Sequence, residues 1–267
     1  MATIVFFHAH PDDECIGSGG TMAKAAVDGH RVVLVVATRG EHGEVVAGVV
    51  VSGGQLGIHR VAETFASAEV LGVQRIEFLG YIDSGMIGTP ENDAPYSFWG
   101  ADVDDAASRL AAILRDEEAD VLVAYDPNGN YGHPDHIQVH RVGYRAAELA
   151  GTPRVYEMTI NRDRMIEAFL ARRDTATAEE LEQLPEIDPD SFQMGMPDAE
   201  ITHSIDVQAL TATKRAAMRC HASQIGEDHF FLTLSDDDFA LAFGTEWFID
   251  RSRPRGAGEA YLTDLFT

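Results

Sequence analysis

Apolar and amphipathic stretches alternate along the first 160 residues of this chain. Runs rich in β-branched or aromatic side chains, which favour buried strands, occupy residues 3–7, 31–38, 75–79, 120–125 and 154–160. Apolar side chains at helical spacing occupy residues 18–28, 57–71, 102–117 and 137–150. This order predicts a three-layer α/β fold, a mostly parallel Rossmann-like sheet with helices on both faces.

The pattern changes elsewhere in the chain. The Gly-rich residues 39–55 have no clear period and predict a loop, although 45–51 could pair as an edge strand. Residues 161–200 are charged and hold too few apolar side chains for their own core, which predicts a surface excursion or flap. We expect one single domain over 1–267, in which 201–267 forms a C-terminal lid portion.

Charge and composition narrow the class of protein. The chain has 267 residues, is 45% hydrophobic and carries a formal charge of −24, so it would repel nucleic acid and anionic membranes. A small neutral or cationic substrate fits better, and a homo-oligomer is compatible with the sequence. The first residues lack a basic region, and no apolar stretch approaches ~20 residues, so we expect a soluble cytoplasmic protein.

Two polar clusters follow predicted strands. The first is His10-Pro-Asp-Asp-Glu14 and the second is Tyr131-Gly-His-Pro-Asp-His136. Three consecutive acids at the end of a buried strand repel one another, and a cation beside them relieves the repulsion. Ligands of α/β sheets bind beyond the carboxyl ends of the strands, where both clusters are expected. The pattern therefore predicts a divalent metal site.

The residue types indicate how such a site would be built. His10, Asp13 and His136 make a His₂–carboxylate set that leaves room for water, as catalytic zinc (Zn²⁺) requires. From the residues alone, Asp12 could replace Asp13 as the ligand. The same set suits non-haem iron, so Fe²⁺ or another divalent ion is an alternative. With only two cysteines, Cys15 and Cys220, a thiolate zinc knot is excluded.

The two motifs, in this order at strand ends, resemble the PIG-L/LmbE family of metal-dependent N-deacetylases. The resemblance is to the branch that deacetylates N-acetylglucosaminyl-inositol and cleaves mycothiol conjugates. It covers residues 1–160 and, more thinly, His221-Ala-Ser-Gln224. It implies a zinc-dependent N-deacetylase or amidase, in which Asp13 binds the metal and Asp12 is the general base.

The resemblance also assigns roles to further residues. It makes His133 a protonated stabiliser of the oxyanion or the acid for the leaving amine. Asp135 could hold that imidazole charged, and Tyr131 is a further donor. The positions that would grip a sugar–inositol substrate are Glu44, Arg60 and Asp83.

Structural roles compete with these assignments. Arg60 could simply pair with Glu63 on a helix surface, and Asp83 lies in a turn-prone Asp-Ser-Gly sequence that favours turn capping. Single histidines such as His8 are expected to be structural or exposed. The glycines of Gly17-Ser-Gly-Gly20 are similar to a dinucleotide loop, but the preceding acids would repel a pyrophosphate.

The sequence thus predicts a metal-dependent hydrolase that removes an acetyl group from the amine of a small N-acetylglucosaminyl-type glycoside. A mycothiol-conjugate amidase is the nearest alternative. A non-haem iron oxygenase and a non-catalytic, metal-stabilised sugar-binding module are alternatives of other classes.

Overall fold

One mixed sheet organises the described part of the chain. The computed structural model describes residues 1–51, 54–177, 188–189 and 191–266. The seven strands lie in the order β3-β2-β1-β4-β5-β7-β6. Their bounds are β1 Thr3–His8, β2 Arg31–Val36, β3 Arg75–Phe78, β4 Val121–Tyr125, β5 Arg154–Thr159, β6 His203–Asp206 and β7 Thr245–Ile249. Strands β1 to β5 pair in parallel and β7 is antiparallel to both neighbours, so the predicted mostly parallel sheet is confirmed.

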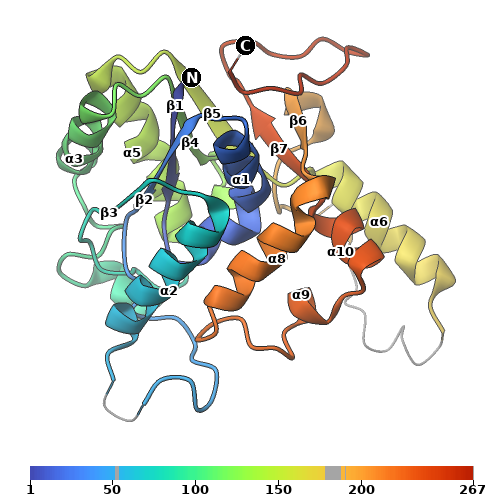
Figure 1. Ribbon diagram of the computed structural model, residues 1–267, viewed down its shortest axis with the longest axis horizontal. Coiled ribbons are helices and arrows are strands. Elements are labelled where there is room, and N and C mark those ends of the chain that lie inside the picture. Colours follow the sequence, from blue (N-terminus) through green and yellow to red (C-terminus); the bar gives the residue numbers. More distant parts are fainter. Residues whose placement is uncertain (52–53, 178–187, 190, 267) are drawn as a thin grey trace.

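Helices cover both faces of the sheet, which explains the continuous apolar runs of the central strands. One face carries α1 (Gly19–Val27), α2 (Leu56–Leu71) and α8 (Thr211–Cys220), which contact one another (Figure 1). The opposite face carries the contacting pair α3 (Val103–Asp116) and α5 (Pro134–Ala150). Strands β1, β2 and β4 are almost wholly buried between these layers.

The strand order reverses at β1. Its Phe6 is paired with Leu34 of β2 on one side and with Val123 of β4 on the other. Chains that leave neighbouring strands toward opposite faces open a crevice beyond the carboxyl ends of those strands. Both polar motifs follow strands that border this crevice.

The C-terminal part differs from the predicted lid. Strand β7 lies between β5 and β6, so this part of the chain completes the sheet. The remaining helices are α6 (Arg162–Thr175), α9 (Phe230–Thr233) and α10 (Asp236–Phe243). Helix α6 lies at the side of the molecule (Figure 1). Residues 178–187 and 190 of the predicted excursion lie outside the described residues.

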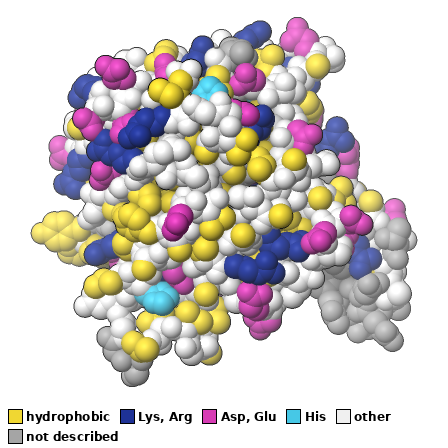
Figure 2. Space-filling model, in the orientation of Figure 1, with side chains coloured by type: hydrophobic (Ala, Val, Ile, Leu, Met, Phe, Trp, Pro, Cys, Tyr) yellow, Lys and Arg dark blue, Asp and Glu magenta, His cyan; other side chains and the backbone are white. Residues whose placement is uncertain are grey.

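Two local predictions need correction. Residues 45–51 form no strand, and the Val46 N–H instead donates to the Ser223 carbonyl at 2.9 Å, which attaches the loop to the chain after α8. Helix α2 was placed correctly by its apolar spacing, but Ile58 and Phe65 are 60% and 53% exposed. Figure 2 shows hydrophobic side chains gathered over α2 on this face. Polar residues of α2 point inward because they support the site described below.

A buried carboxylate ties the C-terminal strands to α1. Glu246 of β7 accepts hydrogen bonds from the Gly20 and Thr21 amides at 2.8 and 2.7 Å and from Lys214 Nζ at 2.5 Å. These helix N-terminal amides are the groups that a pyrophosphate would need. Their occupation by Glu246 agrees with the rejection of a dinucleotide loop. Within the described ranges, none of the helices combines the length and apolar composition needed to cross a bilayer.

The Lys214–Glu246 pair generates a stability prediction. Lys214→Met leaves a buried carboxylate without its cation, so the free energy of unfolding should fall by ~3–5 kcal/mol in urea denaturation. Lys24→Met is the matched control, because Lys24 pairs with Asp28 on the surface, and it should cost no more than ~0.5 kcal/mol. Equal small losses in the two variants would contradict the structural role of Glu246.

Candidate active site

The first motif begins directly after β1. His8, the last residue of the strand, is buried, with Nδ1 3.0 Å from the Tyr125 hydroxyl and Nε2 3.0 Å from Ser18 Oγ. Burial lowers the pKa of His8 to about 4. Its ring is therefore neutral and fully engaged, as expected of a structural histidine. His10 is the histidine of this loop that faces the crevice.

The two motifs meet at the carboxylate of Asp13. Its Oδ2 lies 3.4 Å from His10 Nδ1, and its Oδ1 lies 3.4 Å from His136 Nε2. The ring centroids of His10 and His136 are 5.3 Å apart. Side chains far apart in sequence thus converge at the crevice between β1 and β4, as the motif pair predicted.

The donor set fits a divalent cation. Both ring nitrogens of His136 are buried and have no hydrogen-bond partner in the described structure. Burial opposes ionisation of Asp13, but His136 and His10 outweigh it and hold the pKa of this carboxyl well below its usual range. An anion between two imidazoles, one of them unpartnered, is the arrangement that a metal ion would satisfy.

Other ligating groups also gather nearby. Besides the Asp13 set, the described residues place together His10 with His133 and His136, His10 with Asp83 and Asp135, and Glu14 with Cys15 and His221. In the last two sets the carboxylates make further hydrogen bonds. Asp83 and Asp135 accept backbone amides, as Asp13 does from His10 N at 2.8 Å, and Glu14 binds His221 Nε2 at 2.6 Å. The unpartnered His136 favours the two sets that contain it, and of these the Asp13 set also supplies a carboxylate.

Asp12 lies beside this site in a strained conformation. Its φ is +98°, which side chains other than glycine rarely adopt. Its Oδ2 accepts a hydrogen bond from Arg60 Nη2 at 3.1 Å. Burial raises the pKa of Asp12 to about 6, although Arg60 opposes the shift. A carboxylate with a pKa near neutrality is suited to accept a proton.

Arg60 does not grip a substrate in this arrangement. Its side chain comes from α2 and is only 3% exposed. Besides Asp12, its guanidinium donates to the carbonyls of Gly40, at 2.8 Å, and Pro11. It therefore fixes the loops after β1 and β2. The alternative pairing with Glu63 is also wrong, because Glu63 accepts from the Ser223 amide and hydroxyl at 2.7 and 2.6 Å.

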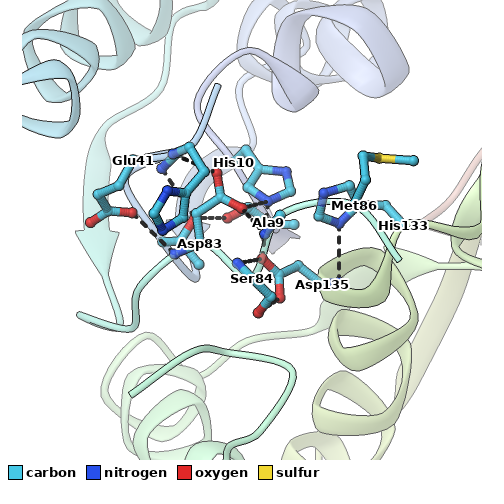
Figure 3. A network of polar contacts seen from close by, with 12 residues as sticks. Ala9, His10, Glu41, Asp83, Ser84, Met86, His133 and Asp135 are labelled. Carbon is cyan, nitrogen blue, oxygen red and sulfur yellow. Dashed lines mark hydrogen bonds and ion pairs between the residues drawn. The ribbon is translucent and has the colours of Figure 1, made fainter. Parts of the chain in front are cut away.

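A polar network surrounds the far side of His10 (Figure 3). His10 Nε2 lies 3.1 Å from Asp135 Oδ2 and 3.5 Å from Asp83 Oδ1. Asp83 also accepts the amides of Gly85 at 2.8 Å and His42 at 3.2 Å, so it caps its turn and faces the site at once. A carboxylate on one ring nitrogen fixes the orientation in which the other nitrogen is offered to a metal.

The expectation that Asp135 keeps His133 charged is wrong. Its carboxylate binds His10 and accepts from Ser84 N at 2.9 Å and Ser84 Oγ at 2.5 Å. His133 Nδ1 instead accepts the backbone N–H of Asp135 at 3.1 Å. Burial, with His10 and His136 nearby, lowers the pKa of His133 to about 4. The imidazole is therefore neutral at pH 7, with its proton on Nε2.

Tyr131 stands at the rim of the site. It is about half exposed, and its ring centroid is 4.9 Å from that of His136. Burial raises the pKa of its phenol, which therefore stays a protonated donor. The preceding turn needs Gly129, with φ +61°, because a Cβ there would come within 2.7 Å of His136 Cβ.

Glu44 is exposed on the loop after β2, and the polar network around His10 includes a different glutamate of this loop. Its neighbour Glu41 reaches that network instead, because Glu41 Oε2 accepts the Asp83 amide at 3.1 Å. Nothing in the sequence distinguishes the two glutamates, which stand three residues apart in the same loop.

Sequence reasoning also missed the roles of Glu14 and His221. Glu14 Oε2 accepts the Asp12 amide at 2.9 Å, and Oε1 accepts from Ser67 Oγ and His221 Nε2, both at 2.6 Å. Although burial opposes it, His221 lowers the pKa of Glu14. The available signals were the third acid of the first motif and the thin resemblance around His221.

Comparisons with known proteins identify the family of this chain. Residues 5–147 match the family model described as PIG-L, GlcNAc-PI de-N-acetylase. The chain is 41% identical to the 1D-myo-inositol 2-acetamido-2-deoxy-alpha-D-glucopyranoside deacetylase of Acidothermus cellulolyticus, over 100% of this chain and 94% of that protein.

Two solved structures share the fold. The N,N'-diacetylchitobiose deacetylase of Pyrococcus horikoshii is 25% identical with a TM-score of 0.58, over 93% of this chain and 83% of that one. The 4-carboxy-2-hydroxymuconate hydratase of Pseudomonas putida is 21% identical with a TM-score of 0.61, over 97% and 100%. Because a hydratase has this fold, the fold alone does not define the reaction.

The geometry predicts which histidine a bound ion requires. Purified protein should hold about one divalent ion per chain, measured by mass spectrometry of the metals. His136→Ala should lose it at metal concentrations that saturate the original protein, because two ligands remain. His203→Gln is the control, since His203 is equally buried but lies in β6. Retention by His136→Ala combined with loss in Cys15→Ser would move the site to Glu14, Cys15 and His221.

Proposed function

This chain belongs to the GlcNAc-PI de-N-acetylase (PIG-L) family, and we propose a substrate, a metal and residue roles on that premise. It is a metal-dependent hydrolase that removes an acetyl group from the amine of a small N-acetylglucosaminyl-type glycoside. The proposed substrate is an α-linked N-acetylglucosaminyl-inositol. The observation that carries this proposal is 41% identity, along the full chain, with a deacetylase named for that compound.

The charge of the protein supports a neutral substrate. A formal charge of −24 disfavours phosphorylated sugars, whereas an inositol glycoside carries no charge. Asp83, and Glu44 from the exposed loop, are proposed to contact the hydroxyl groups of the sugar. Carboxylates suit that task because each oxygen accepts hydrogen bonds from hydroxyl donors.

Zinc is the proposed metal, held by His10 Nδ1, the Asp13 carboxylate and His136 Nε2. Iron(II) and other divalent ions also bind such nitrogen and oxygen donors. When bound, the ion would supply Lewis acidity, which lowers the pKa of water and polarises an amide carbonyl. The Asp135 carboxylate on His10 Nε2 orients the imidazole for this task.

Asp12 is the proposed general base. Arg60 holds its Oδ2, which leaves Oδ1 to take a proton from the attacking water. A base with a pKa of about 6 is ionised at neutral pH and is still basic enough to accept that proton. The proton would then pass to the amine that leaves.

His133 and Tyr131 are the proposed donors to the oxyanion. His133 accepts at Nδ1, so Nε2 carries the hydrogen that can point at the developing charge. The protonated phenol of Tyr131 offers a second donor from the rim. Tyr131 is half exposed, so we expect it to close on the oxyanion only when substrate excludes water.

The alternatives receive less support. Family membership favours hydrolysis over an iron-dependent oxygenase and over a binding module without catalysis. A mycothiol-conjugate amidase would use the same residues on a different amide. Relatives named as glycoside deacetylases favour deacetylation over that activity.

Replacing the proposed base tests the residue roles. Asp12→Ala should bind its ion normally but lower kcat by ~10²-fold or more, because the water loses its proton acceptor. Acetate release and metal content are measured on the same sample. Turnover equal to that of the original protein would exclude Asp12 as the base.

A substrate panel tests the proposed glycoside. We expect acetate release from N-acetylglucosaminyl-inositol with a kcat/KM ~10-fold or more above that of N-acetylglucosamine, because contacts to the inositol contribute to transition-state binding. The rate should be the same with and without O₂, as hydrolysis requires. Preference for a mycothiol conjugate, or dependence on O₂, would overturn the proposal.

A further inference from the structure

A fully buried carboxylate–imidazole pair lies directly behind the proposed base. His221 follows the C-terminal end of α8 and reaches Glu14 of the first motif, with Nε2 2.6 Å from Oε1. Both side chains are completely shielded from solvent. Neither contacts the open side of the crevice, so neither is a candidate to touch substrate.

The pair is linked to the strained backbone at Asp12. The second oxygen of Glu14, Oε2, accepts the Asp12 N–H at 2.9 Å. This bond is local, between residues two apart, and the φ of +98° at Asp12 is a strained conformation for a residue other than glycine. A strained conformation persists only where surrounding groups fix it. Glu14 can do so only if its own carboxylate is held.

Two donors hold the other oxygen of Glu14. Ser67 Oγ from α2 and His221 Nε2 both lie 2.6 Å from Oε1. Of these two donors, His221 is more than two hundred residues from Glu14 in the sequence, so it links the segment after α8 to the first motif. His221 is also the donor that can carry positive charge. Arg60 binds Oδ2 of the Asp12 carboxylate, and the backbone from which this side chain projects depends on the contacts of Glu14.

We propose that His221 is a positioning residue for the deacetylation, which acts through Glu14 to fix the backbone of Asp12 and so to aim its carboxylate at the attacking water. The inference rests on the proposed role of Asp12 as the base. His221→Gln can supply an amide donor near the place of Nε2, whereas His221→Leu fills the volume without a donor.

A double-mutant cycle distinguishes positioning from general stability. His221→Leu should keep its metal and its KM while kcat falls ~10- to 100-fold, because a misdirected base loses reaction geometry. His221→Gln should recover kcat to within about threefold of the original protein. In an Asp12→Ala background, His221→Leu should lower kcat by less than about a further twofold, because the carboxylate that His221 positions is absent.

Controls keep the outcomes separate. His203→Leu removes another buried histidine, far from the motif in β6, and should lower the melting temperature without changing kcat. All rates are measured where circular dichroism shows folded protein. If His221→Leu does not fold, Ser67→Ala removes the other donor to Glu14 Oε1 and should lower kcat about two- to fivefold at unchanged KM.

Each result decides one point. Unchanged kcat in His221→Leu, or in Ser67→Ala where that variant is used, overturns the inference. So does a loss that is fully additive with Asp12→Ala. If the original protein releases no acetate, or if Asp12→Ala matches it, the proposed function fails and takes this inference with it.

Discussion

Mutual repulsion among three consecutive carboxylates is the constraint that shapes this site. Asp12, Asp13 and Glu14 leave β1 together, and each turns to a different partner from a different part of the chain. Asp12 meets Arg60 of α2, Asp13 meets His10 and His136, and Glu14 meets His221 after α8. The left-handed backbone at Asp12 and the π-helical turn at Glu14–Ser18 separate the three directions. The central carboxylate lies beside His136, and both ring nitrogens of His136 lack a hydrogen-bond partner in the described residues.

The strand order of the sheet brings these partners together. The reversal of strand order at β1 lets α2 and α8 approach the motif from one face while α5 brings His133 and His136 from the other. This explains why α2 buries Arg60 and Glu63 and leaves Ile58 and Phe65 exposed. The inner face of that helix carries charged side chains because they bind other groups of the site. The strands and helices α3 and α5 supply the buried apolar side chains.

Much of this was predictable from the sequence because its signals are local. Strand and helix order follow from periodicity, and the two motifs predicted the convergence of His10, Asp13 and His136. The residues that pair with a buried charge follow no periodic pattern in the sequence. Arg60 was therefore misassigned and His221 was missed. Strand β7 was not predicted because it has only five residues and is partly polar. The orientation of Asp135 toward His10 depends on Ser84, in a loop whose path only coordinates reveal.

The central claim is that one cation joins the two motifs at Asp13. Crystals grown with zinc and measured at the zinc absorption edge test it most directly. The account predicts a single anomalous peak about 2.0–2.3 Å from His10 Nδ1, the Asp13 carboxylate and His136 Nε2. A peak held instead by Glu14, Cys15 and His221, or by Asp83 and Asp135, would contradict it.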